Sequence, residues 1–429
     1  MKIVYLCHFS NALIRSRLHL KTYKLRSFLL SLAGKSSSIS YNDFAIWNSD
    51  MAEEFKKINN HEFHLISPHN GMIRNTEHFK EKGVNYHFYK CNGSLLTDII
   101  RSTFKLDRRN NYRRFRFKIK KIIHRIKPDV VVVCGADQPY FSSGIFDIDS
   151  LPVYVLLQTV INNPEVKKYY KNGNEMGRIE EKVFRQTNYV GTNEKYLKLF
   201  RQYNSFAYCL PYYFPSHQPP IIKDTQKKFD FVFYASIIQK NKGIEDVIKA
   251  YNIVYSKHPQ VSLNICGNVN PEYKKYLESL IAQEALVNGR VVFTGFFPNL
   301  DEKYKHIQKS KIVVIPGISS ALNSTVRESL LMGLPTIVYE TSEIVKINKN
   351  IQVVVTARME DVDDLADKMD YMLMNPKYAE DVAREGKKYA DKIWDNSIVV
   401  SNFLTNVEAI VNHYYNNQPI PKELLMDIE

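Results

Sequence analysis

Short runs of β-branched and aromatic residues alternate with longer helical stretches along the chain, and this alternation occurs twice. Such an order is typical of parallel sheets whose connecting helices cover both faces. The expected strands are 2–7, 62–67, 84–89, 129–134, 152–157 and 189–192 in the first half, and 230–235, 261–267, 290–295, 311–317, 335–340 and 351–355 in the second. We therefore predict an α/β protein with two Rossmann-like, doubly wound parallel-sheet domains.

A length of 429 residues exceeds what one hydrophobic core usually supports, which also favours two domains. The stretch 210–228 is rich in proline and polar residues and is typical of a linker. The predicted domains are therefore 1–209 and 229–390. In such folds ligands bind beyond the carboxyl ends of the strands, so functional residues are expected in the loops that follow them.

The bulk composition is that of an ordinary folded protein, with 44% hydrophobic and 24% charged residues. No apolar run approaches the ~20 residues that span a bilayer, and the first residues do not resemble a secretory signal. The five cysteines are widely spaced and lack CxxC or clustered histidine partners, which favours reduced thiols over disulfides or a zinc site. We expect a cytoplasmic protein.

Positive charge is concentrated between Arg101 and Lys127, where twelve Lys and Arg face one acid, so this segment supplies 11 of the 14 net positive charges. Its second half has apolar residues at helical spacing. One interpretation is an ordinary helix with a solvated basic face; the other is a surface that binds anionic lipid head groups, and the charge excess favours the latter for 101–116. No nucleic-acid-binding motif is recognisable. The predicted membrane-binding residues are Arg108, Arg109, Arg113, Arg114 and Arg116.

The second half contains a turn of small polar residues that leads into a helix, within "PGISSALNSTVRESLLMGLPTIV" at 316–338. The free N–H groups of such a turn, at Ser324 and Thr325, favour a diphosphate. In an alternative interpretation, Asn323 or Ser324 is only a helix N-cap. Lys242 can reach the same diphosphate as a point charge, although taken alone it is an ordinary surface lysine.

Four stretches in one order, "FYASIIQKNKGIEDVIKAY", "LNICGN", "VVFTGFFPN" and the turn and helix above, resemble the donor domain of family 4 retaining glycosyltransferases. The resemblance covers about residues 230–375, and the first half is similar only in architecture. It implies the GT-B fold, with two domains facing a central cleft and a segment 391–429 that crosses back toward the first domain. It also implies a nucleotide diphosphate sugar as donor, with no metal or other cofactor.

The resemblance assigns roles to particular residues. Catalytic roles are implied for Glu328, Lys242 and His8, with Glu328 accepting hydrogen bonds from ribose hydroxyls and His8 orienting an acceptor hydroxyl. Asn11, Arg15 and Gln158 are candidates on the acceptor side. The expected donor-binding residues are Lys242, Gly267, Phe296, Ser320, Asn323, Ser324, Thr325 and Glu328.

Three positions depart from the family pattern. Ser320 stands where the first of two glutamates is expected, Ile237 or Ser236 replaces an arginine, and Gln158 replaces a histidine. A serine cannot stabilise a developing oxocarbenium ion electrostatically as a carboxylate does. With these departures nucleotide binding is still expected, whereas catalysis becomes an open question.

The leading hypothesis is a cytoplasmic hexosyltransferase, peripheral to the inner face of the membrane, that acts on a lipid-linked or surface polysaccharide precursor. The alternatives are an inactive relative that binds a sugar nucleotide or a partner subunit, a sugar-nucleotide epimerase of the same fold, and an adaptor built around the basic segment 101–127.

Overall fold

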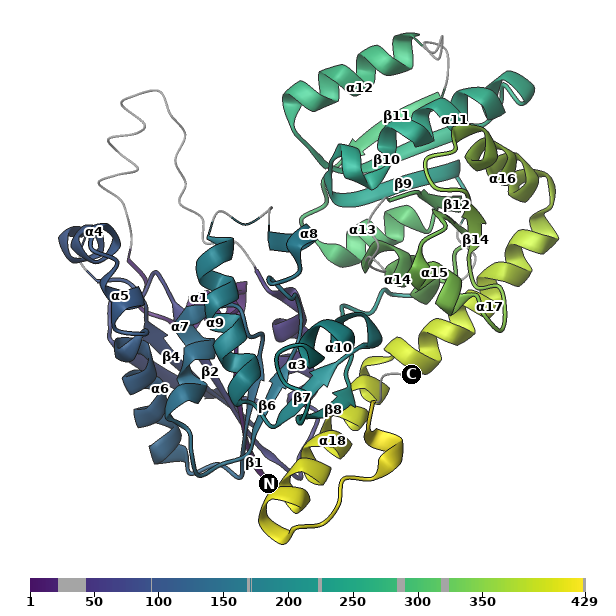
Figure 1. Cartoon of the computed structure of the whole chain (residues 1–429). Helices are drawn as coiled ribbons and strands as arrows, with labels where there is room; N and C mark the ends of the chain where they lie inside the picture. Colours follow the sequence, from purple (N-terminus) through teal and green to yellow (C-terminus); the bar gives the residue numbers. More distant parts are fainter. Residues whose placement is uncertain are drawn as a thin grey trace. The chain divides into compact units, whose positions relative to one another are not determined.

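The computed structural model describes residues 1–21, 44–93, 95–167, 170, 172–222, 226–283, 290–317 and 324–426. The chain divides into two compact units (Figure 1). Unit 1 contains Met1–Ser216 together with Asn396–Glu429, and unit 2 contains His217–Asp395. The stretch 210–228, expected to be a linker, therefore contains the boundary, and its first residues belong to unit 1.

Unit 1 is built on an eight-stranded sheet in the order β3-β4-β2-β1-β5-β6-β7-β8. All described neighbours are parallel except β3 and β4. The strands are β1 (Lys2–Leu6), β2 (Glu62–His69), β3 (Thr76–Glu81), β4 (Val84–Lys90), β5 (Val130–Cys134), β6 (Val153–Leu156), β7 (Tyr189–Thr192) and β8 (Tyr208–Pro211).

Helices cover both faces of this sheet, since one buried cluster contains residues of α3 and α18 and another contains residues of α6 and α9. The helices of unit 1 are α1 (Ala12–Arg17), α3 (Ile46–Phe55), α4 (Leu95–Thr103), α5 (Leu106–Arg109), α6 (Arg113–Ile126), α7 (Pro139–Ser142), α8 (Pro164–Lys167), α9 (Gly173–Gln186), α10 (Glu194–Arg201) and α18 (Asn396–Asn416), with 3-10 turns η1 (Ser143–Asp147) and η4 (Lys422–Leu424).

Unit 2 has a six-stranded parallel sheet in the order β11-β10-β9-β12-β13-β14. The strands are β9 (Phe229–Ile238), β10 (Ser262–Val269), β11 (Arg290–Gly295), β12 (Ser310–Ile315), β13 (Thr336–Tyr339) and β14 (Val355–Ala357). The helices are α11 (Ile244–Lys257), α12 (Pro271–Gln283), α13 (Leu300–Ile307), α14 (Ser324–Leu331), α15 (Ser342–Ile347), α16 (Val362–Met374) and α17 (Pro376–Trp394), with the 3-10 turn η2 (Lys240–Lys242). The prediction of two α/β domains with parallel sheets is confirmed.

The last long helix, α18, belongs to unit 1 although it follows unit 2 in the chain. Its residues Phe403, Val407 and Ile410 are fully buried in the core beside strand residues of β1 and β6. Asn406 is also buried, and its amide nitrogen donates to the Tyr154 hydroxyl at 3.2 Å and to the Pro211 carbonyl at 2.9 Å. The helix is thus an integral part of the first unit.

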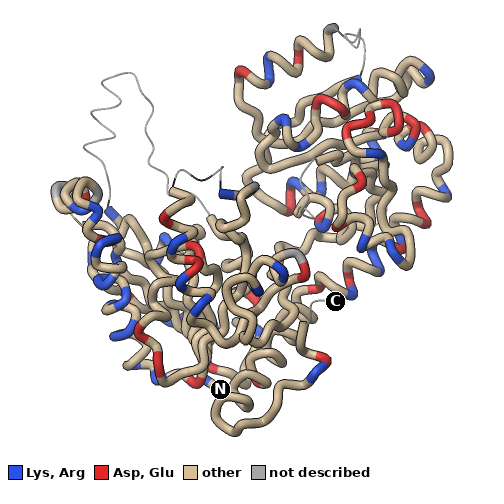
Figure 2. Tube along the Cα trace, in the orientation of Figure 1, with Lys and Arg blue, Asp and Glu red and all other residues tan. Residues whose placement is uncertain are grey.

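The basic segment forms α4, α5 and α6, and Figure 2 shows Lys and Arg gathered along these elements. The predicted apolar stripe of α6 is confirmed, since Tyr112, Phe115, Ile119, Ile122, Ile123 and Ile126 are all buried. No described helix is both long enough and apolar enough to cross a membrane.

Candidate functional site

Two glycines of unit 2 bring the strand ends close together. Gly243 has φ of 78°, and a side-chain carbon there would lie 2.1 Å from the carbonyl oxygen of Pro316, just beyond β12. Gly267 on β10 has φ of 148°, and its side-chain carbon would lie 2.0 Å from the carbonyl oxygen of Ala235 on β9. Only glycine permits both the conformation and the contact. These contacts place Lys242, directly before Gly243, at the carboxyl end of the sheet.

The first turn of α14 is tied to the sheet by a buried tyrosine. The hydroxyl of Tyr234, on β9, donates to the carbonyl oxygen of Thr325 and lies 2.8 Å from both that oxygen and the hydroxyl of Ser329. Ser324 and Thr325 thus begin a helix that is fixed to β9. The predicted site residues Ser320 and Asn323 lie outside the described residues.

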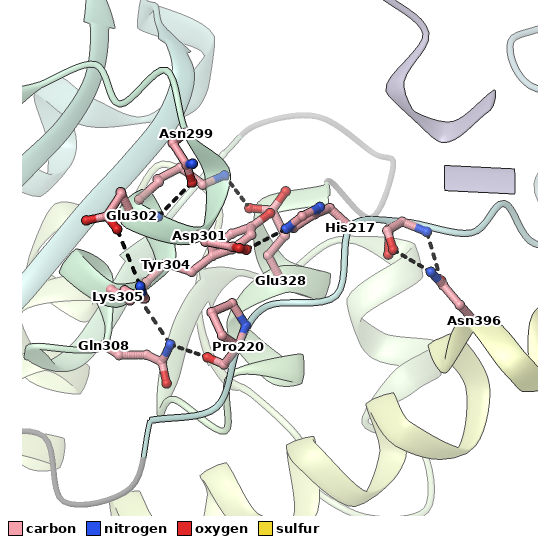
Figure 3. Close-up of polar contacts among 12 residues, drawn as sticks. His217, Pro220, Asn299, Asp301, Glu302, Tyr304, Lys305, Gln308, Glu328 and Asn396 are labelled. Atoms are coloured by element: carbon pink, nitrogen blue, oxygen red, sulfur yellow. Dashed lines mark hydrogen bonds and ion pairs between the residues drawn. The ribbon is translucent and has the colours of Figure 1, made fainter. Parts of the chain in front are cut away.

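Glu328 forms an ion pair that the sequence did not predict. Its carboxylate oxygen Oε2 accepts from the ammonium of Lys303, on α13, at 3.0 Å, and both side chains are about 15% exposed (Figure 3). The ammonium of Lys303 also lies 4.2 Å from the ring centroid of Tyr304. Glu328 is therefore held in place by α13, and a ligand hydroxyl would share this carboxylate with Lys303.

Phe296 follows the end of β11, where Gly295 adopts φ of 74°, and its side chain is 60% exposed. It is available to pack against a flat apolar group. Ile237 and Ser236, the two candidates for the position where the family pattern has an arginine, lie on β9, and Ile237 is 56% exposed. Strand β9 therefore ends at Ile238, three residues beyond its predicted end, and includes this position.

In unit 1, His8 follows β1 and lies between two aromatic rings. Its ring centroid is 5.4 Å from that of Phe44 and 5.3 Å from that of Phe141. The Nδ1 atom is buried and has no hydrogen-bond partner among the described residues. Burial lowers the pKa of His8 to about 4, so the ring is neutral near pH 7 and can accept a hydrogen bond.

A buried amide joins β1 and β5 and was not found from the sequence. The Oδ1 atom of Asn48, on α3, accepts from the Tyr5 hydroxyl at 3.1 Å and from the Cys134 thiol at 2.9 Å. Its Nδ2 atom donates to the carbonyl oxygen of His8 at 3.0 Å. Gln158 joins the same cluster through a 2.7 Å contact with the sulfur of Cys134. Burial raises the pKa of Cys134 to about 12, so this thiol is not a nucleophile at neutral pH.

The other two acceptor-side candidates lie at the start of α1 and on it, and Asn11 also donates from Nδ2 to the hydroxyl of Ser49, on α3, at 3.1 Å. Asn11 is the N-cap of α1, and its Oδ1 atom accepts from the backbone N–H of Ile14 at 2.9 Å. Arg15 donates to the hydroxyl of Ser10 at 3.1 Å. Both side chains therefore support the loop after β1.

Two buried acids also lie near the strand ends. Asp137 follows β5 and is 7% exposed, and burial raises the pKa of its carboxyl. Glu180, on α9, is fully buried, and its carboxylate accepts from the backbone N–H groups of Ile161 and Asn162, both at 2.8 Å. Burial raises the pKa of Glu180 to about 8, although these donors act in the opposite direction. Glu180 thus fixes the loop that carries Gln158.

The altered pKa of His8 gives a pH dependence of stability. Between about pH 6.5 and pH 4 the unfolded chain binds a proton at His8 that the folded protein does not, so the free energy of unfolding falls as the pH falls. Replacing His8 by Gln should reduce this slope by up to ~1.4 kcal/mol per pH unit, measured by urea unfolding at several pH values. Replacing the exposed His124 by Gln is the control. If the His8 variant has the same slope of unfolding free energy against pH as the wild type, the prediction is contradicted.

No group of three or more His, Cys, Asp or Glu residues suited to a metal ion occurs in the described part of the chain. The five cysteines are free and buried.

The two α/β units with parallel sheets have the architecture of the GT-B fold. Residues 219–389, which is less than half the chain, match the family model of Glycosyl transferases group 1. This range includes Lys242, Lys303 and Glu328. No curated protein sequence matches the chain.

Solved structures with the GT-B fold superpose on almost the whole chain. Sucrose-phosphate synthase from Thermosynechococcus elongatus is 11% identical with a TM-score of 0.62, covering 95% of this chain and 98% of its own. HepE of Anabaena, solved with UDP and glucose, is 13% identical with a TM-score of 0.59, covering 95% and 100%. OtsA is 9% identical with a TM-score of 0.62, covering 98% and 100%. At this identity the similarity establishes the fold.

Proposed function

We propose that the protein is a glycosyltransferase that moves a sugar from a nucleotide diphosphate sugar to a lipid-linked or surface polysaccharide precursor, with retention of configuration. The observation that carries the proposal is the match of residues 219–389 to Glycosyl transferases group 1, because this range holds Lys242, the start of α14 and Glu328. The complex of HepE with UDP makes UDP-sugars the first donors to test.

In this proposal the positive groups of unit 2 bind the diphosphate. Lys242 supplies a point charge, and the backbone N–H groups at Ser324 and Thr325 add the favourable end of a helix dipole. Together they stabilise the leaving diphosphate, whose own oxygen accepts the proton of the acceptor hydroxyl. No metal or other cofactor is part of the proposal.

Glu328 would accept hydrogen bonds from the two ribose hydroxyls, and Phe296 would contact the base. The ion pair with Lys303 supports this assignment, because it holds the carboxylate oriented before the ligand arrives. In unit 1, the neutral ring of His8 and the buried carboxyl of Asp137 would bind hydroxyl groups of the acceptor.

The proposal places the protein at the inner face of the membrane, through α4 and α5. Ile99, Ile100 and Phe104 are 55%, 43% and 57% exposed, beside the exposed Arg109. Of the other predicted membrane-binding arginines, Arg113 is exposed. Three are already paired with acids: Arg108 with Glu175, Arg114 with Asp107 and Arg116 with Asp147. The proposed membrane contact therefore has fewer unpaired arginines than the sequence predicted, and it also includes exposed apolar side chains.

Nucleotide binding tests the proposal directly. A panel of UDP-, GDP-, ADP- and CMP-sugars should contain one that raises the melting temperature, by an amount equivalent to about 2.7 kcal/mol at a ligand concentration 100 times Kd. Glu328→Ala should weaken nucleoside and nucleotide binding alike in calorimetry, because both share the ribose. Glu343→Ala, a change in a surface pair on α15, is the control.

Two outcomes would contradict the proposal. If Glu328→Ala binds the nucleotide as tightly as the wild type, the donor site has been placed wrongly. If the protein binds a sugar nucleotide but neither transfers nor slowly hydrolyses it in the presence of membranes and acceptor, the inactive relative replaces the enzyme.

A further inference from the structure

A groove of about 1200 Å³ runs along α6 in unit 1, between this helix with α4 and α5 on one side and the edge strands β3 and β4 on the other. Figure 1 shows α4, α5 and α6 following one another at this edge of unit 1. The groove is formed by elements of unit 1 alone. No residue assigned above to the donor site or to the acceptor side lines it, whereas Arg113 and Arg114, predicted above to bind the membrane, do.

Positive side chains follow one another along the groove. Arg114, Lys118, Lys121 and Arg125 line it at spacings of four, three and four residues, so they form one row on α6. At 1.5 Å per residue, the row is about 16 Å long. Arg101 and Arg113 also line the groove.

The negative side chains of the groove are already paired. Asp107 accepts from Nε and Nη2 of Arg114, at 2.7 and 2.8 Å. Glu77 lies 2.9 Å from the Nδ1 atom of His19. The groove thus holds six cationic side chains against two acids, and one of the six, Arg114, is itself paired with Asp107. A row of cations with so little compensation favours an elongated anionic ligand.

Apolar side chains lie beside the cations of the groove. Phe117 is 67% exposed and lines the groove one residue before Lys118, and Leu106 and Ile122 also contribute to the wall. On the opposite wall, the rings of His78 and His87 stack with centroids 5.6 Å apart. Sugar rings present apolar C–H faces as well as hydroxyl groups, so a wall of exposed rings beside cations suits a charged sugar chain.

We propose that this groove binds a segment of a linear anionic glycan, the polymer that carries the acceptor end. The proposal deepens and rests on the proposed function, which makes a glycan the expected partner. A bilayer surface is broad and fits protruding side chains, whereas this row of cations lines a concave wall. A nucleic acid is the other polyanion that a cationic groove could hold.

The test uses an oligogalacturonide of ten residues, with one carboxylate on each sugar, and the full-length protein in calorimetry at low salt. The wild type should bind it and lose affinity as the salt concentration rises. The neutral methyl ester should bind much more weakly. Lys121→Gln with Arg125→Gln should weaken binding about tenfold, because two partly desolvated ionic contacts are lost.

The matched control is Lys120→Gln with Lys127→Gln, which removes the same charge from α6 and its C-cap, at exposed residues outside the groove. It should change the affinity less than twofold. An equal loss in both double variants would overturn the proposal, since it would show only a general charge effect. No binding by the wild type would overturn it as well.

Two further arms separate the partners. If Lys121→Gln with Arg125→Gln reduces binding to vesicles of anionic phospholipid, or to a thymidine oligonucleotide, as much as it reduces binding to the oligogalacturonide, the glycan assignment is wrong. Nucleotide calorimetry in the same samples keeps the two proposals distinct. Nucleotide binding without glycan binding overturns only the groove, and glycan binding without nucleotide binding overturns only the proposed function.

Discussion

Replacing Lys242 by alanine is expected to lower the rate of sugar transfer by about 10²–10³-fold. Lys242 lies directly before Gly243, whose close contact with Pro316 fixes this turn at the end of β12. A positive group held against a leaving diphosphate gains most when charge develops in the transition state, so its loss should affect kcat more than nucleoside affinity. Steady-state kinetics with the donor identified by calorimetry measure the effect.

The control for Lys242 is Lys249→Ala, which removes an exposed lysine from α11 two turns farther along the chain. This variant should keep the wild-type rate within about twofold, because a solvated surface charge stabilises little. Equal rates for Lys242→Ala and the wild type would remove Lys242 from the proposed site.

Replacing Glu180 by alanine is expected to destabilise unit 1 by about 3–5 kcal/mol. The backbone N–H groups of Ile161 and Asn162 would lose their acceptor, and each unsatisfied buried donor costs about 1–3 kcal/mol in addition to the cavity left by the side chain. The corresponding change in melting temperature for a unit of this size is roughly 10 °C. Glu180→Gln should lose less, since its amide oxygen still accepts.

The neighbouring Glu181 provides a matched control for Glu180. Its side chain is 43% exposed and pairs with Arg185 at the surface of α9. Glu181→Ala should shift the unfolding free energy by no more than about 0.5 kcal/mol. If calorimetric unfolding shows equal losses for the two alanine variants, Glu180 does not hold the loop after β6 as described.

The central strands could be predicted from the sequence, because strands buried on both faces read as continuous apolar runs. Two edge strands could not. β3 reads "TEHFKE" and none of its residues is buried, so it lacks the apolar signal. β8 is four residues long and ends in Pro211, which favoured assignment to a linker.

The predicted strand 351–355 was wrong in position, and the structure shows why. Val353 and Val354 are fully buried, as their apolar character suggested, but their backbone N–H groups donate to the Oδ1 atom of Asn348 at 3.0 and 3.2 Å. The side chain takes the place of a neighbouring strand, and pairing with β13 begins only at Val355. Such competition by an asparagine depends on the folded loop and is not visible in a hydropathy pattern.

The positions of the candidate residues relative to the strands could be predicted from the sequence, whereas the side chains that contact them could not. Lys242, Ser324, Thr325 and Glu328 follow or flank strand ends as expected for this fold. Lys303 was missed because it lies 25 residues before Glu328 on another helix. Arg108 and Arg116 of the basic segment were expected to be unpaired because the acids that bind them also lie far along the chain.

The position of α18 has a consequence for synthesis on the ribosome. Unit 2 is continuous in sequence, whereas the core of unit 1 includes Phe403, Val407 and Ile410 from the last part of the chain. At ~5–20 residues per second, translation of residues 217–395 takes roughly 10–40 s. During this interval the nascent first unit lacks one covering helix and exposes apolar core surface, so unit 1 can be completed only after all of unit 2 has been synthesised.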